Sequence, residues 1–191
     1  MKNIDRISAV WLDEVQDIVG PDGIREGSDT DPYNEDPRGR FQGNAHLVLR
    51  PNTTEQVAAI VTRCNEAKVG IIPFSGGTGV VAGQLCVDGG SGIILSLERM
   101  NQIRKIVVDD SVIVAEAGCI LKNVHAAAAR HGMLFPLSMA SKGSCCIGGN
   151  LATNAGGIQV VRHGNARDLC LGIEAVMPNG EIYSDLSPPR K

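Results

Sequence analysis

Two segments rich in small residues contain the backbone and side chains best suited to hold a ligand. The first spans residues 73–83 and reads Pro-Phe-Ser-Gly-Gly-Thr-Gly-Val-Val-Ala-Gly, directly after an apolar stretch typical of a buried strand. Consecutive glycines allow positive φ angles and turn several backbone N–H groups toward one point. Such a loop binds phosphate oxygens, and Ser75 and Thr78 add hydroxyl donors. The alternative is a tight structural loop without a ligand.

The second segment covers residues 138–157 and contains Lys-Gly-Ser-Cys-Cys-Ile-Gly-Gly-Asn-Leu-Ala-Thr-Asn-Ala-Gly-Gly at its C-terminal end. Small residues let a flat group approach the backbone closely, and Ser144, Thr153 and Asn154 offer hydrogen bonds. The Gly148-Gly149 step could present N–H groups at the start of a helix. Two such segments in one small chain suggest a long ligand with a diphosphate and a flat ring.

A dinucleotide-binding pattern overlaps the first segment. Residues 77–82 read Gly-Thr-Gly-Val-Val-Ala, and Glu98 follows about 20 residues on, as in nicotinamide-binding sites. That pattern requires a helix directly after the second glycine. Residues 80–92 contain too many turn-forming residues for such a helix. We therefore regard a nicotinamide site as the weaker alternative, to be decided by the structure of that stretch.

Other reactive side chains give weaker signals. Arg162 or His163 could reach the edge of a bound ring, and Lys142 could neutralise a phosphate, although surface roles are more common for such residues. Cys145 and Cys146 flank the second segment, where small size explains them better than redox chemistry. None of the four histidines has metal-ligand spacing to another histidine or to a carboxylate: His46, His125, His131 and His163. We expect no metal site.

Composition excludes several classes of function. The net charge is −3 and aromatic residues make up 3% of the chain, which disfavours nucleic-acid binding. There is no run of 18 apolar residues, so we expect no membrane-spanning segment. The six cysteines form no C-x-x-C pair, and the first residues lack the apolar region of a signal peptide. These features predict reduced thiols in a cytoplasmic protein.

The elements that must position the two segments follow from apolar periodicity. Residues 1–20 predict an amphipathic helix, and residues 29–42 an exposed, proline-containing loop. A strand at 47–49, a helix that begins with a Thr53–Gln56 capping box, and a strand at 70–73 predict a βαβ unit with at least one parallel pair. The other expected elements are strands at 93–95, 103–108 and 112–116, a helix at 121–130, and strands at 171–177 and 181–183 joined by a turn.

Together the two segments resemble the FAD-binding domain of the vanillyl-alcohol oxidase superfamily, and within it the D-2-hydroxyacid dehydrogenases. The Arg50-Pro51 start of the βαβ helix and the Gly180-Glu181-Ile182 stretch also match, so the resemblance runs from about Leu47 onward. It implies an α+β, two-lobed PCMH-type FAD-binding domain, with a small βαβ lobe and a larger, mainly antiparallel sheet lobe with helices. Residues 1–45 would be a helix-and-loop extension, and residues 46–191 an FAD-binding domain that is incomplete at its C-terminus.

The resemblance also implies which residues contact the cofactor. The first group would wrap the diphosphate and shape its loop: Pro73, Ser75, Gly76, Gly77, Thr78, Gly79, Val80 and Gly83. The second would line the channel between the lobes: Pro136, Ser141, Gly143 and Ser144. The third would meet the diphosphate, the ribityl chain, the ring edge or the adenine: Ile147, Gly148, Gly149, Ala152, Thr153, Asn154, Gly157 and Ile182. Relatives with covalent FAD have a histidine where this chain has Thr78, so we expect non-covalent FAD.

The implied activity is oxidation of a D-2-hydroxyacid, of the D-lactate, D-2-hydroxyglutarate or glycolate type, by hydride transfer to FAD. In this family the substrate-binding groups come from a separate C-terminal domain, which this chain lacks. We therefore expect no catalytic residue here and no activity from the chain alone. The alternative is a non-catalytic FAD-binding or subunit fragment. The electron acceptor is not predicted, and an open sheet edge would permit a homo-oligomer.

Overall fold

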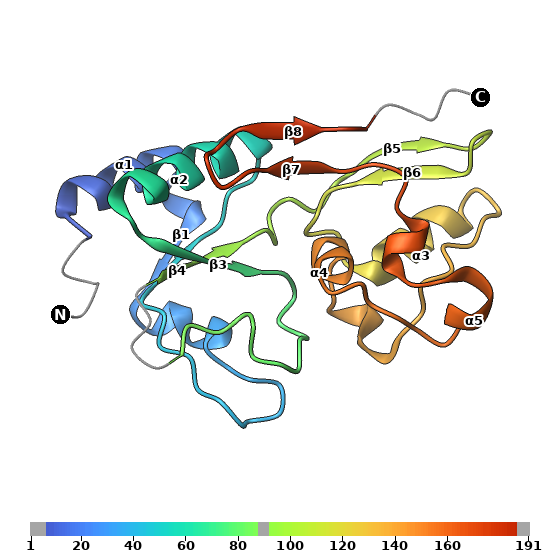
Figure 1. Ribbon diagram of the computed structural model, residues 1–191, viewed down its shortest axis with the longest axis horizontal. Coiled ribbons are helices and arrows are strands. Elements are labelled where there is room, and N and C mark those ends of the chain that lie inside the picture. The colour runs from blue at the N-terminus through green and yellow to red at the C-terminus, as the bar shows by residue number, and fades with distance from the viewer. Residues whose placement is uncertain (1–6, 88–91, 187–191) are drawn as a thin grey trace.

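The first lobe is built on a four-stranded sheet with the strand order β1-β2-β4-β3 (Figure 1). In the computed structural model, which describes residues 7–87 and 92–186, β2 (Leu47–Leu49), β4 (Gly92–Ser96) and β3 (Gly70–Phe74) run parallel. The edge strand β1 (Ile24–Glu26) pairs antiparallel with β2. Three consecutive residues of central β4, Ile93 to Leu95, are buried, as expected for a strand covered on both faces.

The predicted βαβ unit is confirmed, with one addition. The helix α2 (Thr54–Ala67) connects β2 to β3, but the two strands do not pair with each other, because β4 lies between them. At the N-terminus of α2 the Thr53 hydroxyl accepts the Gln56 N–H at 3.1 Å. The Gln56 side chain accepts the Asn52 N–H rather than that of Thr53, so only half of the predicted capping box forms.

Helices α1 (Ala9–Val19) and α2 pack together on one face of this sheet (Figure 1). The helix predicted over residues 1–20 is present as α1, which begins at Ala9. Residues 1–6 lie outside the described residues. The Trp11 indole N–H donates to the Arg63 carbonyl of α2 at 3.3 Å. The buried apolar residues of this layer form the main core: Trp11, Val15, Val19, Leu47, Leu49, Val57, Ile60, Cys64, Val69, Ile93, Leu95 and Met100.

The stretch at 29–42 was predicted as an exposed loop, and most of it is exposed, including all of 37–42, but four of its residues are buried in the first lobe. It begins within the 3₁₀ helix η3 (Gly27–Tyr33), and Tyr33, Asn34 and Asp36 are buried. The Tyr33 ring makes an edge contact with Phe74, with ring centroids 5.0 Å apart. Polar and proline-rich composition predicted exposure, but Asn34 and the Asp36 Oδ2 make hydrogen bonds inside the protein, whereas the buried Asp36 Oδ1 has no partner among the described residues.

The second lobe carries two antiparallel hairpins and short helices. Its hairpins are β5 (Ile103–Val107) with β6 (Val112–Ala115), and β7 (Glu174–Val176) with β8 (Ile182–Ser184). The helices are α3 (Leu121–Ala129), α4 (Ile147–Ala152) and α5 (Val160–His163), and the 3₁₀ turns are η4 (Ala140–Gly143) and η5 (Ala166–Leu169). A further 3₁₀ turn, η2 (Pro21–Gly23), connects α1 to β1 in the first lobe. Every strand pair of this lobe within the described residues is antiparallel, as predicted.

The β7–β8 hairpin reaches back from the second lobe to α2 of the first (Figure 1). A Cβ atom on Gly180 in its turn would lie 2.1 Å from the Thr62 Oγ1 of α2. Beside this contact, the Arg104 guanidinium bonds Glu174 at 2.7 Å and Glu116 at 3.2 Å. The Thr54 hydroxyl at the start of α2 also donates to Glu174, at 2.7 Å. The contacts of Gly180 with Thr62 and of Glu174 with Thr54 join the two lobes along one side, whereas the two Arg104 ion pairs lie within the second lobe.

Candidate functional site

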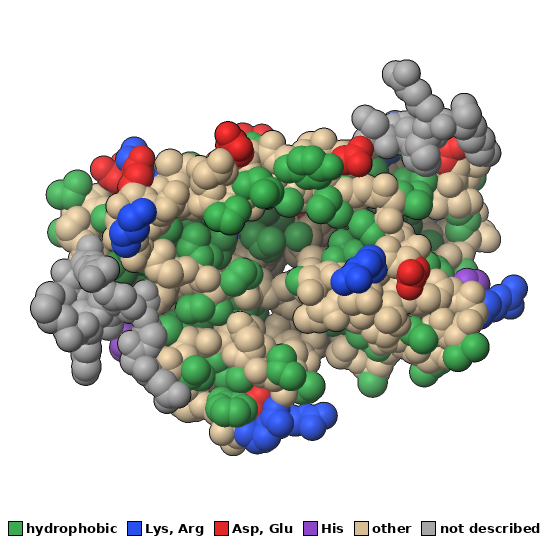
Figure 2. All heavy atoms as spheres, in the orientation of Figure 1, with side chains coloured by type: hydrophobic (Ala, Val, Ile, Leu, Met, Phe, Trp, Pro, Cys, Tyr) green, Lys and Arg blue, Asp and Glu red, His purple; other side chains and the backbone are tan. Residues whose placement is uncertain are grey.

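The two glycine-rich segments meet at the junction of the lobes, although about 70 residues separate them in the sequence. The Gly149 N–H of α4 donates to the Ser75 hydroxyl at 3.0 Å. A Cβ atom on Gly76 would lie 2.3 Å from the Ser144 carbonyl oxygen, so no larger residue fits there. Figure 2 shows the face of the molecule hollowed between the lobes, with hydrophobic side chains along the hollow.

The loop after β3 has the backbone geometry of an anion-binding nest. Gly76 and Gly77 have φ angles of +73° and +62°, in the left-handed region that favours glycine. Within the described part of the chain, no backbone N–H from Gly76 to Val81 has a hydrogen-bond partner in the protein. Consecutive N–H groups left free by left-handed backbone form a cradle for anionic oxygens. This is the arrangement predicted from the sequence for residues 75–80.

The Gly148-Gly149 step was predicted to present backbone N–H groups to a ligand at the start of a helix, but in the structure these groups donate to the protein itself. Its first three N–H groups donate inside the protein: Ile147 to the Cys119 carbonyl at 3.0 Å, Gly148 to the Ala117 carbonyl at 2.8 Å, and Gly149 to Ser75. A Cβ on Gly148 would come within 2.8 Å of Ala117. The glycine pair therefore permits close packing of α4, and its N–H groups are not available to a phosphate.

One buried side chain in α4 was not singled out by sequence reasoning. Asn150 is 4% exposed, and its Nδ2 atom is buried without a hydrogen-bond partner among the described residues. An unpaired buried amide is costly, so it marks a place where a ligand group or a water molecule belongs. Nearby, the Asn154 Oδ1 accepts the Arg167 N–H at 3.0 Å, and the Thr153 hydroxyl donates to the Gly149 carbonyl at 2.8 Å.

The remaining predicted cofactor residues lie in the 136–144 segment, next to it at Gly157, and elsewhere at Gly83 and Ile182. Pro136, Ser141 and Gly143 lie in the 136–144 segment, and a Cβ on Gly157 would meet the Ser138 carbonyl of that segment at 2.1 Å. Gly83 and Gly143, by contrast, have nothing within 4 Å of such an atom. The structure does not place Ile182 with the crossing segments: it lies on β8 and is 45% exposed.

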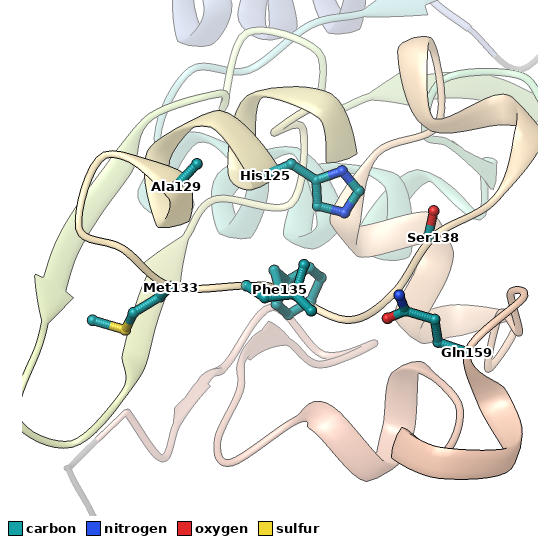
Figure 3. A pocket seen from close by; sticks show the side chains of 7 residues that line it. His125, Ala129, Met133, Phe135, Ser138 and Gln159 are labelled. Carbon is teal, nitrogen blue, oxygen red and sulfur yellow. The ribbon is translucent and has the colours of Figure 1, made fainter.

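A hollow of about 250 Å³ lies against α3 and is also lined by residues 133–135, by Ser138 of the 136–144 segment and by Gln159. The side chains of His125, Phe135 and Gln159 turn toward it (Figure 3). The His125 Nε2 is 2.8 Å from the Leu137 carbonyl oxygen, which fixes the ring. None of the residues predicted to contact a cofactor lines this hollow. We assign it no role in cofactor binding.

The electrostatics of the site favour an anion. Residues 117–173 contain five Lys or Arg residues against a single acidic residue, Asp168. None of the five cations forms an ion pair within the described chain, whereas Arg40, Arg50, Arg63 and Arg104 outside this stretch all do. The 117–173 stretch that contains the second segment is thus locally basic and attracts negatively charged ligands, although the acidic residues of the two hairpins balance the charge of the lobe as a whole.

The cysteines near the site are poor nucleophiles. Burial raises the pKa of the Cys146 thiol beside Ser75 and also that of Cys119. A raised pKa leaves these thiols protonated and unreactive at neutral pH. Among the described residues, no group of three or more His, Cys, Asp or Glu side chains could hold a metal ion. No helix of the described residues is long and apolar enough to cross a lipid bilayer.

Comparison with known proteins decides the family. The family model of an FAD binding domain matches residues 45–185, which is most of the chain. The chain belongs to this family. Solved structures agree: 6-hydroxy-D-nicotine oxidase of Arthrobacter nicotinovorans matches with a TM-score of 0.72 and 25% identity over 85% of this chain and 35% of its own. p-Cresol methylhydroxylase matches with a TM-score of 0.71 and 23% identity over 93% of this chain and 36% of its own. The fold is therefore the α+β, PCMH-type FAD-binding fold that the resemblance predicted.

Sequence relatives are D-lactate and D-2-hydroxyglutarate dehydrogenases by name. A mitochondrial protein of Schizosaccharomyces pombe named as a D-lactate dehydrogenase is 39% identical over 91% of this chain and 33% of its own length. The mitochondrial D-2-hydroxyglutarate dehydrogenase of Bos taurus is 38% identical over 88% of this chain and 30% of its own length. The D-2-hydroxyglutarate dehydrogenase of Xanthomonas citri is 38% identical over 82% of this chain and 33% of its own length. The chain thus spans about a third of the length of the curated relatives that it matches.

Two sequence expectations change at this point. The prediction of a cytoplasmic protein is wrong, because the S. pombe and Bos taurus relatives are mitochondrial by name. Buried reduced thiols fit any reducing compartment, so cysteine usage could not make that distinction. The nicotinamide alternative also fails: residues 80–87 contain no helix, residues 88–91 lie outside the described residues, and the family match is to FAD binding.

Proposed function

We propose that this chain binds FAD without a covalent bond and forms the FAD-binding part of an enzyme that oxidises a D-2-hydroxyacid. The observation that carries the proposal is that the loop whose N–H groups from Gly76 to Val81 are free within the described chain meets the second glycine-rich segment, where the Gly149 N–H donates to the Ser75 hydroxyl. The geometry fits the group: Gly76 and Gly77 have positive φ angles in a loop whose backbone N–H groups are free within the described chain, and the buried Asn150 amide nitrogen has no partner among the described residues. The names of the relatives support the substrate class.

Each part of the chain has a role in this proposal. The N–H groups from Gly76 to Val81 hold the diphosphate, and the Thr78 hydroxyl adds a donor. The Ser75–Gly149 hydrogen bond keeps the two segments at a fixed separation. Asn150 donates its free N–H to the cofactor, and the unpaired cations of the second lobe offset its negative charge. When bound, FAD supplies a flavin ring that accepts the hydride from the substrate carbon.

The groups that bind and deprotonate the hydroxyacid are proposed to lie in the part of the relatives that this chain does not span. The chain alone is then inactive, and the choice among D-lactate, D-2-hydroxyglutarate and glycolate depends on those groups. The division at residues 45 and 46 and the cofactor contacts of the individual residues remain predictions.

A titration tests the proposal. FAD is added to the purified chain while flavin fluorescence is followed, and the wild type should bind saturably and show flavin absorbance after gel filtration. Gly76→Ala should weaken binding at least tenfold, because the added methyl group meets the Ser144 carbonyl at 2.3 Å and φ is +73°. Gly132→Ala is the matched control: Gly132 also has a positive φ, +70°, has nothing within 4 Å of an added Cβ and is not among the predicted cofactor residues, so its affinity should equal that of the wild type.

Three outcomes separate the possibilities. Binding that is lost in Gly76→Ala alone supports the FAD site. Absence of binding to the wild type, on a chain that circular dichroism shows to be folded, overturns the proposal for this chain. Acid denaturation of the loaded protein should release all flavin into the supernatant, and flavin that stays on the protein would contradict non-covalent binding.

A further inference from the structure

One residue that precedes the matched family region contacts the 75–81 loop, and a second residue of the same segment holds it in place. Asp36 and Arg40 lie in the segment between η3 and β2, before residue 45 where the family match begins. Sequence reasoning treated this segment as an exposed extension. In the structure the Arg40 guanidinium donates to the carbonyl oxygen of Val80, the last residue of the proposed diphosphate loop.

Asp36 fixes the position of Arg40. Its carboxylate accepts the Arg40 backbone N–H at 2.8 Å, and the Arg40 Nε lies 3.6 Å from the same oxygen. The Asp36 side chain has no exposed surface, which is unusual for an acidic residue. The Arg40 N–H lowers the pKa of Asp36, and backbone N–H groups of Arg38 and Phe41 contribute, so this buried group stays charged at neutral pH.

The turn that carries Asp36 and Arg40 is itself anchored in the lobe. The buried Asn34 amide donates to the Ala45 carbonyl at 3.0 Å and accepts the Ala45 N–H at 2.8 Å. The Asn44 N–H donates to the Cys86 carbonyl at 2.8 Å, which ties the turn to the far end of the 73–86 stretch. The contact to Val80 therefore comes from a fixed support.

Two carbonyl groups of the loop are held from outside it. The Gln84 amide donates to the Gly79 carbonyl at 3.1 Å, and Arg40 holds the Val80 carbonyl. In a trans peptide the C=O and the following N–H point in opposite directions. Fixing these two carbonyls therefore orients the N–H groups of Val80 and Val81, which have no partner within the described chain.

We propose that Asp36 and Arg40 form a latch that holds the 75–81 loop in its anion-binding shape before the cofactor arrives. Arg40 is a positioning residue, which acts through the Val80 carbonyl, and Asp36 orients Arg40. The inference rests on the proposed function for its consequence, FAD affinity. Its structural part, the ordering of the loop, stands independently and is measured without FAD.

The experiment measures ¹⁵N relaxation of the Gly76, Gly77 and Gly79 amides in the ligand-free chain, followed by FAD titration. In the wild type these order parameters should be about 0.85, typical of rigid backbone, and in Arg40→Ala they should fall below about 0.6. Asp36→Ala should produce the same fall, and Arg40→Lys should restore part of the order. Arg38→Ala is the control, because Arg38 is exposed on the same turn and forms no ion pair among the described residues.

Each result has a separate meaning. Unchanged order parameters in Arg40→Ala overturn the latch, and so does a loss of order that extends into β4, because Arg40 would then be a general structural residue. If the order parameters fall only in the loop, FAD affinity should fall at least tenfold in Arg40→Ala and stay unchanged in Arg38→Ala. Equal FAD affinity in Arg40→Ala and wild type overturns the positioning role. Failure of the wild type to bind FAD, with the loop effect present, counts against the proposed function and not against the latch.

Discussion

The two lobes differ in how much of their stability they supply themselves. Among the described residues, the main core of the first lobe contains twelve buried apolar residues, and the cluster of the second contains four: Leu121, Leu137, Cys145 and Ala166. The second lobe instead exposes large apolar side chains, with Leu134, Ile158 and Val161 at 69%, 86% and 102% exposure. The second lobe therefore depends on its contacts with the first, and the cofactor loop lies where those contacts are made.

The largest effect should come from removing one fully buried side chain in each lobe. Ile60→Ala and Leu121→Ala both truncate residues with no exposed surface, and such changes cost about 2–5 kcal/mol. Ile60→Ala should lower the free energy of unfolding of the whole chain in urea. Leu121→Ala should accelerate amide hydrogen exchange in residues 121–169 and leave β4 protected. Equal acceleration in both lobes with both variants would show one cooperative unit and break the comparison.

The next effect concerns the attachment of the β7–β8 hairpin to α2. Gly180 and Gly132 both have positive φ, so alanine costs about 1–2 kcal/mol at either position. Only at Gly180 does the new methyl group also meet a neighbour, the Thr62 Oγ1 at 2.1 Å, whereas Gly132 has open space. Gly180→Ala should therefore destabilise the chain in urea by about 1–3 kcal/mol more than Gly132→Ala. In a Thr62→Ala background the difference should shrink, and an undiminished difference would contradict the contact.

These contrasts also show what the sequence could predict. Periodicity predicted α1, α2, α3 and the strands from β2 to β8, because each has a local apolar pattern that one face of a sheet or helix can bury, but it did not predict the short edge strand β1. The two glycine-rich segments were correctly expected at one site, because such residues serve close approach of backbone. The insertion of β4 between β2 and β3 depends on tertiary pairing, which no local pattern encodes. The burial of Asn34 and Asp36 depends on partners such as Ala45 and the Arg40 N–H, so composition alone predicted exposure.

A smaller effect is expected from Arg104, which forms its ion pairs within the second lobe and whose Nη2 donates to the Thr54 hydroxyl of the first lobe at 3.3 Å. Arg104 bonds Glu174 and Glu116 across two hairpins, and its side chain is 34% exposed, so solvent screens the interaction. Arg104→Met should lower the free energy of unfolding by about 1 kcal/mol and accelerate exchange in β7. Arg63→Met is the control within the first lobe, where Arg63 is 46% exposed and pairs with Glu14 and Glu66. Arg63→Met should lower the free energy of unfolding by less than about 0.5 kcal/mol. An equal loss in both variants would show that Arg104 at the junction has no special role.

The smallest effect is the pH dependence of the same junction. Hydrogen bonds from Arg104 and Thr54 lower the pKa of Glu174 in the folded chain. A carboxyl group with a lowered folded pKa contributes stability above its unfolded pKa of about 4.3, and that contribution is lost as the pH falls through the folded value. The difference in unfolding free energy between wild type and Glu174→Gln should therefore be constant above about pH 5.5 and shrink as the pH falls below about 4. Glu181→Gln, on an exposed residue of the same hairpin, is the control. A wild-type advantage over Glu174→Gln that persists unchanged at pH 3 would mean that the Glu174 carboxylate does not hold the lobes together.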